Sequence, residues 1–180
     1  EVKNTSRQVI NEIPEVAYIT LTTDKNIGEE ILLIHDVDPI TIYADIEVEG
    51  ATLVKSEKQE DLQYLNKKLV SNTYRLTSQT VKISGDLSLL YCPYNDITSI
   101  NVANTDLEYL ICDHNSINII LLNSNNPTTL SNNNAPIKTL EATQKSKLKQ
   151  LICDNNQLTE LDIPQNNSLE YLNCSNNKLK

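Results

Sequence analysis

A repeat of about twenty residues occupies the second half of this sequence and constrains its fold more than any other feature. The pattern L-x-x-L-x-C-x-x-N-x-[IL] occurs around Cys92, Cys112, Cys153 and Cys174. A degenerate unit with Pro127, Asn132 and Ala135 at the matching positions lies between the second and third copies. Positions 92, 112, 132, 153 and 174 are separated by 20, 20, 21 and 21 residues. Such a period predicts a solenoid, in which each coil buries its apolar edge against the next coil.

A second alternating stretch follows each copy of the pattern. Ile100–Val102, Ile120–Leu122, Leu140–Ala142 and Leu161–Ile163 lie between Asn-rich turns. Alternation over so few residues is typical of strands, not of helices. The sequence therefore predicts two short strands in each coil, and about five coils between residues 74 and 180, of which the last is truncated.

The four cysteines allow three interpretations. A structural zinc site requires closely spaced pairs, whereas the nearest two cysteines here are twenty positions apart. Disulfides are compatible with the count, but equivalent side chains on adjacent coils point the same way, about 4.8 Å apart, and do not converge. We expect each cysteine to be a reduced, buried, small apolar residue that takes a slot otherwise filled by leucine.

These repeats resemble the bacterial leucine-rich repeats of about twenty-one residues, of the cysteine-ladder type found in internalin J and in Bacteroidetes surface proteins. The segments at 155–163 and 172–179 are close to the consensus sequence of that family. The segment at 74–85 resembles the sequence that precedes the first repeat in such proteins. The resemblance implies a right-handed solenoid of the α/β-horseshoe type, with a parallel sheet and little helix. It also implies secretion or cell-surface display, adhesion, and recognition of other macromolecules.

The degenerate third unit departs from this pattern. In the other units the asparagine is expected to turn inward and to bind backbone groups at the end of each strand. Ala135 removes that asparagine, and Asn132 puts a polar side chain in the cysteine slot. This coil should be weaker than its neighbours unless Asn132 itself reaches the backbone. The departure is either simple sequence drift or a functional hinge.

The N-terminal region, residues 1–73, contains no repeat. Short β-branched runs at 17–23, 31–34, 40–43 and 46–48 lie between turn signals and predict a small antiparallel β-unit that caps the solenoid. The segment 57–69 is either a short helix or a solvated loop. The pairs Asp36/Asp38 and Glu47/Glu49 do not form the ligand series of a calcium loop, so we expect no metal site.

Charge and hydropathy exclude two classes of partner. The formal net charge is −9, and Lys and Arg form no basic stripe, which argues against binding to nucleic acid or to an anionic membrane surface. No stretch of about eighteen apolar residues is present, so we expect no membrane insertion in this segment. The sequence contains no signal or anchor, so the expected extracellular or bacterial cell-surface location would depend on segments outside it.

Catalysis is not predicted. The sequence contains only His35 and His114, and three scattered glycines cannot form a phosphate-binding loop. Cys112 and His114 are close in sequence, but alternation should direct the cysteine inward and leave the histidine at the outer end of the strand. We expect no catalytic residue and no cofactor.

Recognition is the predicted function, with a structural spacer or stalk that displays another domain as the alternative. In each strand the residues beside the inward leucine face outward. Leu89, Tyr91 and Pro93 should be outward on the first coil. A protein or glycan ligand should contact the face bearing Tyr91, Tyr109, Ile111 and Asp113, with further contacts from Tyr94, His114, Ile152 and Asp154.

Overall fold

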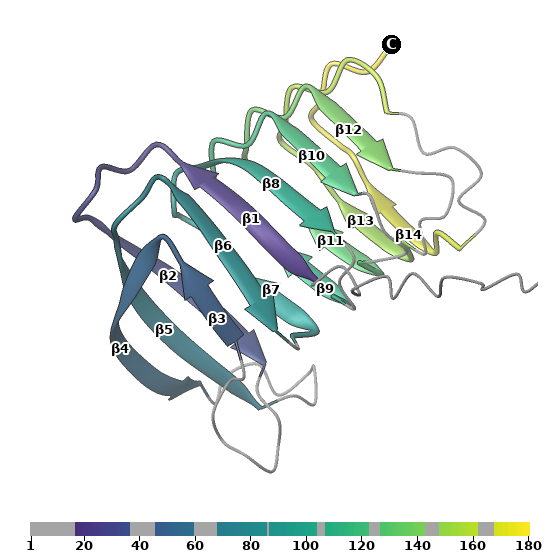
Figure 1. Ribbon diagram of the computed structural model, residues 1–180. Helices are drawn as coiled ribbons and strands as arrows, with labels where there is room; N and C mark the ends of the chain where they lie inside the picture. Colours follow the sequence, from purple (N-terminus) through teal and green to yellow (C-terminus); the bar gives the residue numbers. More distant parts are fainter. Residues whose placement is uncertain are drawn as a thin grey trace, which may run out of the picture.

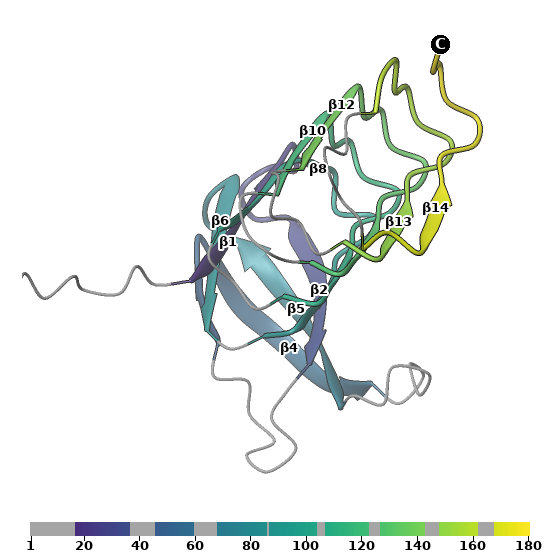
Figure 2. The ribbon, with the colours of Figure 1, turned by 90° about the vertical axis from the view of Figure 1, so that its right-hand side faces the viewer.

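The computed structural model describes residues 17–36, 46–59, 68–85, 87–103, 107–122, 127–142, 148–161 and 168–180. In these residues the chain forms fourteen β-strands and no helix. The strands lie in two mixed sheets that face each other, so the fold is a β-sandwich-like domain (Figures 1 and 2). Short alternating segments and scarce helix-forming runs favour this all-β arrangement.

The six-stranded sheet has the order β12-β10-β8-β1-β6-β3. Its strands are β12 (Thr139–Ala142), β10 (Ile119–Leu122), β8 (Ile97–Ala103), β1 (Tyr18–Thr23), β6 (Thr80–Gly85) and β3 (Ile46–Glu49). The first three run parallel in register, whereas β1 pairs antiparallel with both β8 and β6. An N-terminal strand thus lies in the middle of this sheet.

The eight-stranded sheet has the order β14-β13-β11-β9-β7-β2-β5-β4. Its strands are β14 (Tyr171–Asn173), β13 (Gln150–Ile152), β11 (Thr129–Ser131), β9 (Tyr109–Ile111), β7 (Leu89–Tyr91), β2 (Glu30–Asp36), β5 (Leu69–Leu76) and β4 (Ala51–Gln59). The first five are parallel, and β2 continues the sheet by pairing antiparallel with β7 and β5. We call each of the five parallel strands, with the turn after it, a rung.

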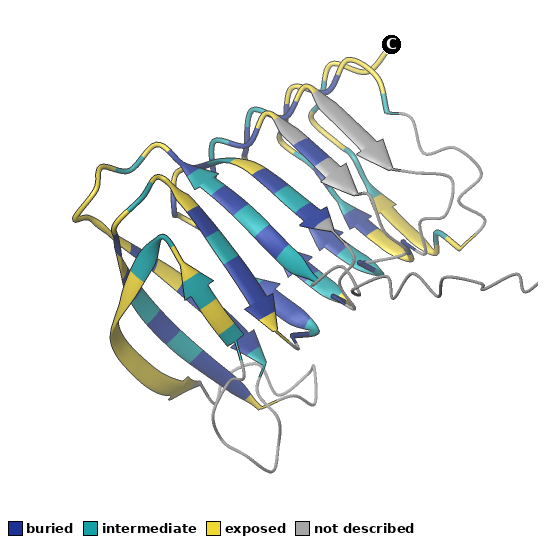
Figure 3. Cartoon of the chain, viewed as in Figure 1, coloured by how far each residue is buried: buried dark blue, intermediate teal, exposed yellow. Residues whose placement is uncertain are grey.

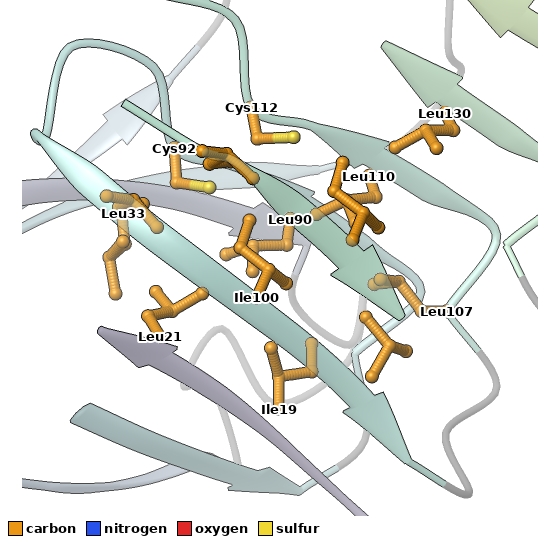
Figure 4. Packing of buried hydrophobic residues seen from close by; sticks show 14 of the residues in the cluster. Ile19, Leu21, Leu33, Leu90, Cys92, Ile100, Leu107, Leu110, Cys112 and Leu130 are labelled. Atoms are coloured by element: carbon orange, nitrogen blue, oxygen red, sulfur yellow. The ribbon is translucent and has the colours of Figure 1, made fainter. Parts of the chain in front are cut away.

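One apolar core fills the space between the sheets (Figure 4). Side chains alternate between the two faces of a strand, so one residue in two points inward. The inward leucines of the first four rungs, Leu90, Leu110, Leu130 and Leu151, are at most 1% exposed. They share the core with Ile19 and Leu21 of β1 and Leu33 of β2. Both halves of the sequence therefore contribute to a single core.

Inward asparagines join successive rungs. The Asn115 Oδ1 atom accepts hydrogen bonds from the backbone N–H groups of Asn95 (2.9 Å) and Ile97 (3.0 Å), and its Nδ2 donates to the carbonyls of Cys92 and Cys112. Equivalent bonds are made by Asn156 and Asn177. These amides pair backbone groups that would otherwise be buried without a partner, as expected from the sequence.

The third unit is imperfect in the way that the sequence indicates. Asn132 is fully buried, but its Oδ1 atom accepts a hydrogen bond from the Cys112 thiol and not from the backbone. Its Nδ2 atom is buried without a hydrogen-bond partner. Asn132 therefore does not replace the missing amide of position 135, and a buried unpaired donor costs free energy.

The predicted fold class, a leucine-rich-repeat solenoid with an N-terminal cap, is wrong. The repeat strands do not form a separate coil of their own, because antiparallel strands from the N-terminal region continue both sheets. Those strands also supply part of the one core and do not simply cover an end. A mixed β-sandwich likewise gives no support to the terms leucine-rich repeat, internalin-like or cell surface. Local periodicity carries no information on which strands flank those of the repeat.

Details of the N-terminal prediction also change. The runs at 17–23, 31–34 and 46–48 do form β1, β2 and β3, but these strands pair with β5 to β8 and not with one another. The run at 40–43 lies outside the described residues. At the ends of the possible helix 57–69, residues 57–59 belong to β4 and Leu69 begins β5, while residues 60–67 lie outside the described residues. The predicted domain boundary between residues 73 and 74 falls inside β5 and remains a prediction.

Candidate recognition site

The outer face of the eight-stranded sheet positions most of the predicted ligand-binding residues. Register places Tyr91 beside Ile111, Ile111 beside Ser131, and Ser131 beside Ile152. The structure therefore brings Tyr91 and Ile111 together, whereas Ile152 lies two strands away from Ile111. Tyr109 is the neighbour of Leu89, two positions before the Tyr91–Ile111 pair on the same two strands. The predicted site is thus divided into a cluster on the first two rungs and a separate pair on the fourth.

Part of this outer face is covered. Leu89, which alternation places outward, is fully buried, and Pro93 is also buried. Leu89, Ile34 and Leu69 form a second small apolar cluster, against which Tyr91 and Tyr109 pack half-buried. The expectation that the outward side chains of Leu89 and Pro93 are exposed is therefore wrong. Leu89 is covered because β2 pairs with β7, and β5 pairs with β2, which brings Ile34 and Leu69 into the same apolar cluster.

The two predicted acidic residues hold neighbouring rungs together. Asp113 Oδ1 accepts hydrogen bonds from Ser131 Oγ (2.7 Å) and from the backbone N–H of Asn133 (2.8 Å). Asp154 accepts from Asn173 Nδ2 (3.0 Å) and from Asn155 Nδ2. Both carboxylates are half-buried. They order the turns at this edge and leave only part of their surface to a ligand.

Tyr94 and His114 lie in the turns that follow β7 and β9, the strands of the first two rungs. We call this edge of the sheet, where the chain turns away from the strands, the corner. Their rings stack with centroids 4.4 Å apart and planes inclined by 26°. Tyr94 is 67% exposed, and His114 is also exposed. The His114 ring lies 3.3 Å from Asn134 Nδ2, measured from Nε2. Sequence reasoning named both residues but did not foresee the stack.

Three further residues belong to this corner and were missed. Asn134, Asn155 and Asn176 have the same left-handed backbone as Tyr94 and His114, with φ between 53° and 56°. All three are exposed. Their positions, 134, 155 and 176, follow 94 and 114 at the spacing of the repeat, and that spacing could have identified them. We call the set Tyr94, His114, Asn134, Asn155 and Asn176 the corner row.

The thiols are not arranged for nucleophilic chemistry. Burial raises the pKa of Cys92 and of Cys153 to about 12, and burial raises that of Cys112 well above its ordinary value. The one proton of the Cys112 thiol is shared between two acceptors at 3.4 Å, the carbonyl of Ser131 and Asn132 Oδ1, while the His114 ring stacks on Tyr94. All four cysteines carry free thiols, but Cys174, in the last rung, is only half-buried. A neutral thiol is a poor nucleophile.

The acidic pairs do not converge on an ion. Asp36 uses its carboxylate to accept hydrogen bonds from the backbone N–H groups of Ser88 and Leu89 (2.9 Å each). Glu49 pairs with Lys82 at 3.3 Å, and Asp38 lies outside the described residues. Within the described part of the chain, no three His, Cys, Asp or Glu side chains form a group able to hold a metal.

A buried polar cluster on β2 and β5 was not predicted. Asn72 Nδ2 lies 3.0 Å from His35 Nε2 and 3.2 Å from the Tyr74 hydroxyl, and His35 Nδ1 lies 2.9 Å from the carbonyl of Asp36. Burial lowers the pKa of His35, and hydrogen bonding to Asp36 opposes that shift. His35 is 37 residues from Asn72 in sequence, so only the pairing of β2 with β5 reveals the cluster.

Comparisons of this chain with family models, with curated proteins and with solved structures found no match. Among the described residues, no helix is long and apolar enough to cross a membrane.

Proposed function

We propose that this protein is a non-enzymatic recognition module that binds a protein or a glycan through the outer surface of its first two rungs. One observation carries the proposal. Half-buried Tyr91, Tyr109 and Ile111 gather on one face, and the exposed Tyr94–His114 stack lies at its edge. Tyrosine is enriched in binding interfaces, because it combines a large apolar ring with a hydroxyl group.

The surroundings of this surface also favour binding over catalysis. Recognition requires a preformed surface, and the backbones of the two rungs are joined by hydrogen bonds such as Cys92 N–H to the Ile111 carbonyl (2.8 Å). A nucleophile, by contrast, requires an ionised or base-assisted group. The burial that raises the thiol pKa values works against that requirement.

The proposal is tested by placing a charge on the surface. In Ile111→Lys a cation lies beside Tyr91, whereas Ile152→Lys introduces the same change two strands further along the same outward row. The wild-type chain and both variants are exposed to an array of purified glycans and to a panel of purified proteins. We expect a ligand that the wild type retains to be lost by Ile111→Lys, because a desolvated cation faces the ligand, and to be kept by Ile152→Lys.

Thermal unfolding followed by circular dichroism checks that both variants fold. A structural spacer would retain no ligand on either panel. Equal retention of the same ligand by all three chains would move the binding surface away from the first two rungs.

A further inference from the structure

The corner row is one exposed line of side chains on a regular backbone (Figure 3 shows exposed residues where the rungs turn). Each member lies three residues after the end of one of the five parallel strands of the eight-stranded sheet, and neighbouring turns are joined by backbone hydrogen bonds. His114 N–H donates to the Asn133 carbonyl at 2.8 Å, and Asn155 N–H donates to the Ser175 carbonyl at 3.0 Å. The row therefore has a fixed spacing of about 4.8 Å, that of adjacent strands.

The five row positions share a left-handed backbone, but they do not all carry the residue type that this conformation favours. A left-handed backbone is tolerated well by Asn, which occupies positions 134, 155 and 176. Tyr94 has a φ of 56°, although a bulky aromatic residue gains nothing from that conformation. Nor is its ring part of the core, since the side chain is 67% exposed. An exposed residue in a strained conformation is a reason to look for a function.

The chemistry of the row is that of a surface for a neutral, hydroxyl-rich ligand. The Tyr94 ring, supported by His114, presents an apolar face that can stack on the C–H face of a sugar ring. The carboxamides further along can donate to hydroxyl groups and accept from them. Asn176 Nδ2 donates to Asn155 Oδ1 at 3.0 Å, which orients both amides and leaves other hydrogen-bonding positions toward solvent.

Charge argues against an anionic ligand. None of the five row residues is Lys or Arg, and Asp154 borders the row through its contact with Asn155. The protein as a whole carries a formal charge of −9. A phosphate or uronate chain would be repelled here, whereas an uncharged glycan would not.

We infer that the corner row binds a neutral glycan chain, with one sugar ring stacked on Tyr94 and the following units lying along Asn134, Asn155 and Asn176. The repeat distance of adjacent strands is comparable to the length of one sugar unit in an extended chain, so successive amides meet successive units. This inference rests on the proposed function. It names the class of ligand, a neutral glycan, and the residues of the corner row that the ligand contacts.

The test removes the ring without disturbing the backbone. Tyr94→Asn gives position 94 the residue that the equivalent positions already have, so this variant should fold as well as the wild type or better. Tyr171→Asn is the matched control, because Tyr171 is also exposed (51%) but lies on β14 and not in the row. Calorimetric titrations use cellohexaose, chitohexaose and mannohexaose as neutral probes, and hexagalacturonate as the anionic one.

We expect at least one neutral hexasaccharide to bind the wild type and Tyr171→Asn alike, and to bind Tyr94→Asn about tenfold more weakly, as the loss of one stacked ring implies. Hexagalacturonate should bind more weakly than the neutral probes. Unchanged hexasaccharide binding by Tyr94→Asn would overturn the inference, as would preferential binding of hexagalacturonate.

The two proposals fail separately. If no hexasaccharide binds but a purified protein binds the wild type and not Ile111→Lys, the glycan inference fails and the proposed function stands. If neither kind of ligand binds, both fail.

Discussion

The antiparallel region, residues 17–85, and the repeat region, residues 87–180, build one core by different means. In the repeat region each strand pairs with the equivalent strand 20 or 21 residues away, so the same inward leucine and asparagine recur in register. In the antiparallel region the partners are unlike, and β1 lies between β6 and β8 while β2 lies between β5 and β7. The first region depends on unique long-range contacts and the second on repetition.

Asn95 is where the two regions meet. Its side chain accepts a hydrogen bond from the Leu32 backbone N–H (2.9 Å) and donates to the Leu32 carbonyl (2.8 Å). In the next rung, Asn115 makes its bonds to the backbone of the preceding rung instead. An asparagine of the repeat thus binds either a parallel or an antiparallel neighbour. This dual use explains how a repeat can be continued by strands that do not share its sequence.

The largest effects should come from truncating inward leucines. Leu33→Ala in β2 and Leu110→Ala in β9 each remove a fully buried side chain from the same core and should each cost about 2–5 kcal/mol. Leu172→Ala, in the last rung, removes a side chain that is 43% exposed and should cost less than about 1.5 kcal/mol. Urea unfolding of the three variants measures these differences.

Cooperativity makes this a direct test of the shared core. If the two regions depend on each other, both Leu33→Ala and Leu110→Ala should lower a single transition, seen alike by circular dichroism and by tyrosine fluorescence. Two separate transitions in Leu33→Ala, one of them at the wild-type midpoint, would mean that the repeat region is stable without the antiparallel one.

A smaller effect, of opposite sign, is expected inside the repeat. Asn132→Cys removes a buried amide nitrogen that has no partner and restores the residue type of the neighbouring rungs, so stability should rise by about 1–3 kcal/mol. Asn115→Ala is the matched control, because that buried amide is fully used between two rungs and its loss should destabilise. Urea midpoints measured under reducing conditions compare the two. A destabilised Asn132→Cys would show that the amide is satisfied in solution.

Sequence periodicity predicted the repeat region better than the antiparallel one, for a physical reason. Alternation reports which face of a strand is apolar, and repetition adds the neighbour, so the inward positions of Leu110, Cys112 and Asn115 follow directly. Neither signal contains the contact between β2 and β7, so the burial of Leu89 was missed. The Tyr94–His114 stack was also not predicted. It depends on the left-handed turn after each strand, and strand alternation contains no information on that turn.

The smallest expected effect is on the pH dependence of stability, and it should differ between the two histidines, His35 in the antiparallel region and His114 in the repeat region. His35 Nδ1 donates to a carbonyl and its Nε2 accepts from Asn72, so the buried ring is neutral and its pKa lies below 6.5. Between that lowered pKa and 6.5 the unfolded chain binds more protons than the folded one, so stability should rise with pH in this window and level off above it. His35→Gln should remove this part of the slope, whereas His114→Gln, at an exposed ring, should keep it. Urea unfolding from pH 5 to pH 7.5 measures the slopes, and an unchanged slope in His35→Gln would mean that other groups set the acid response.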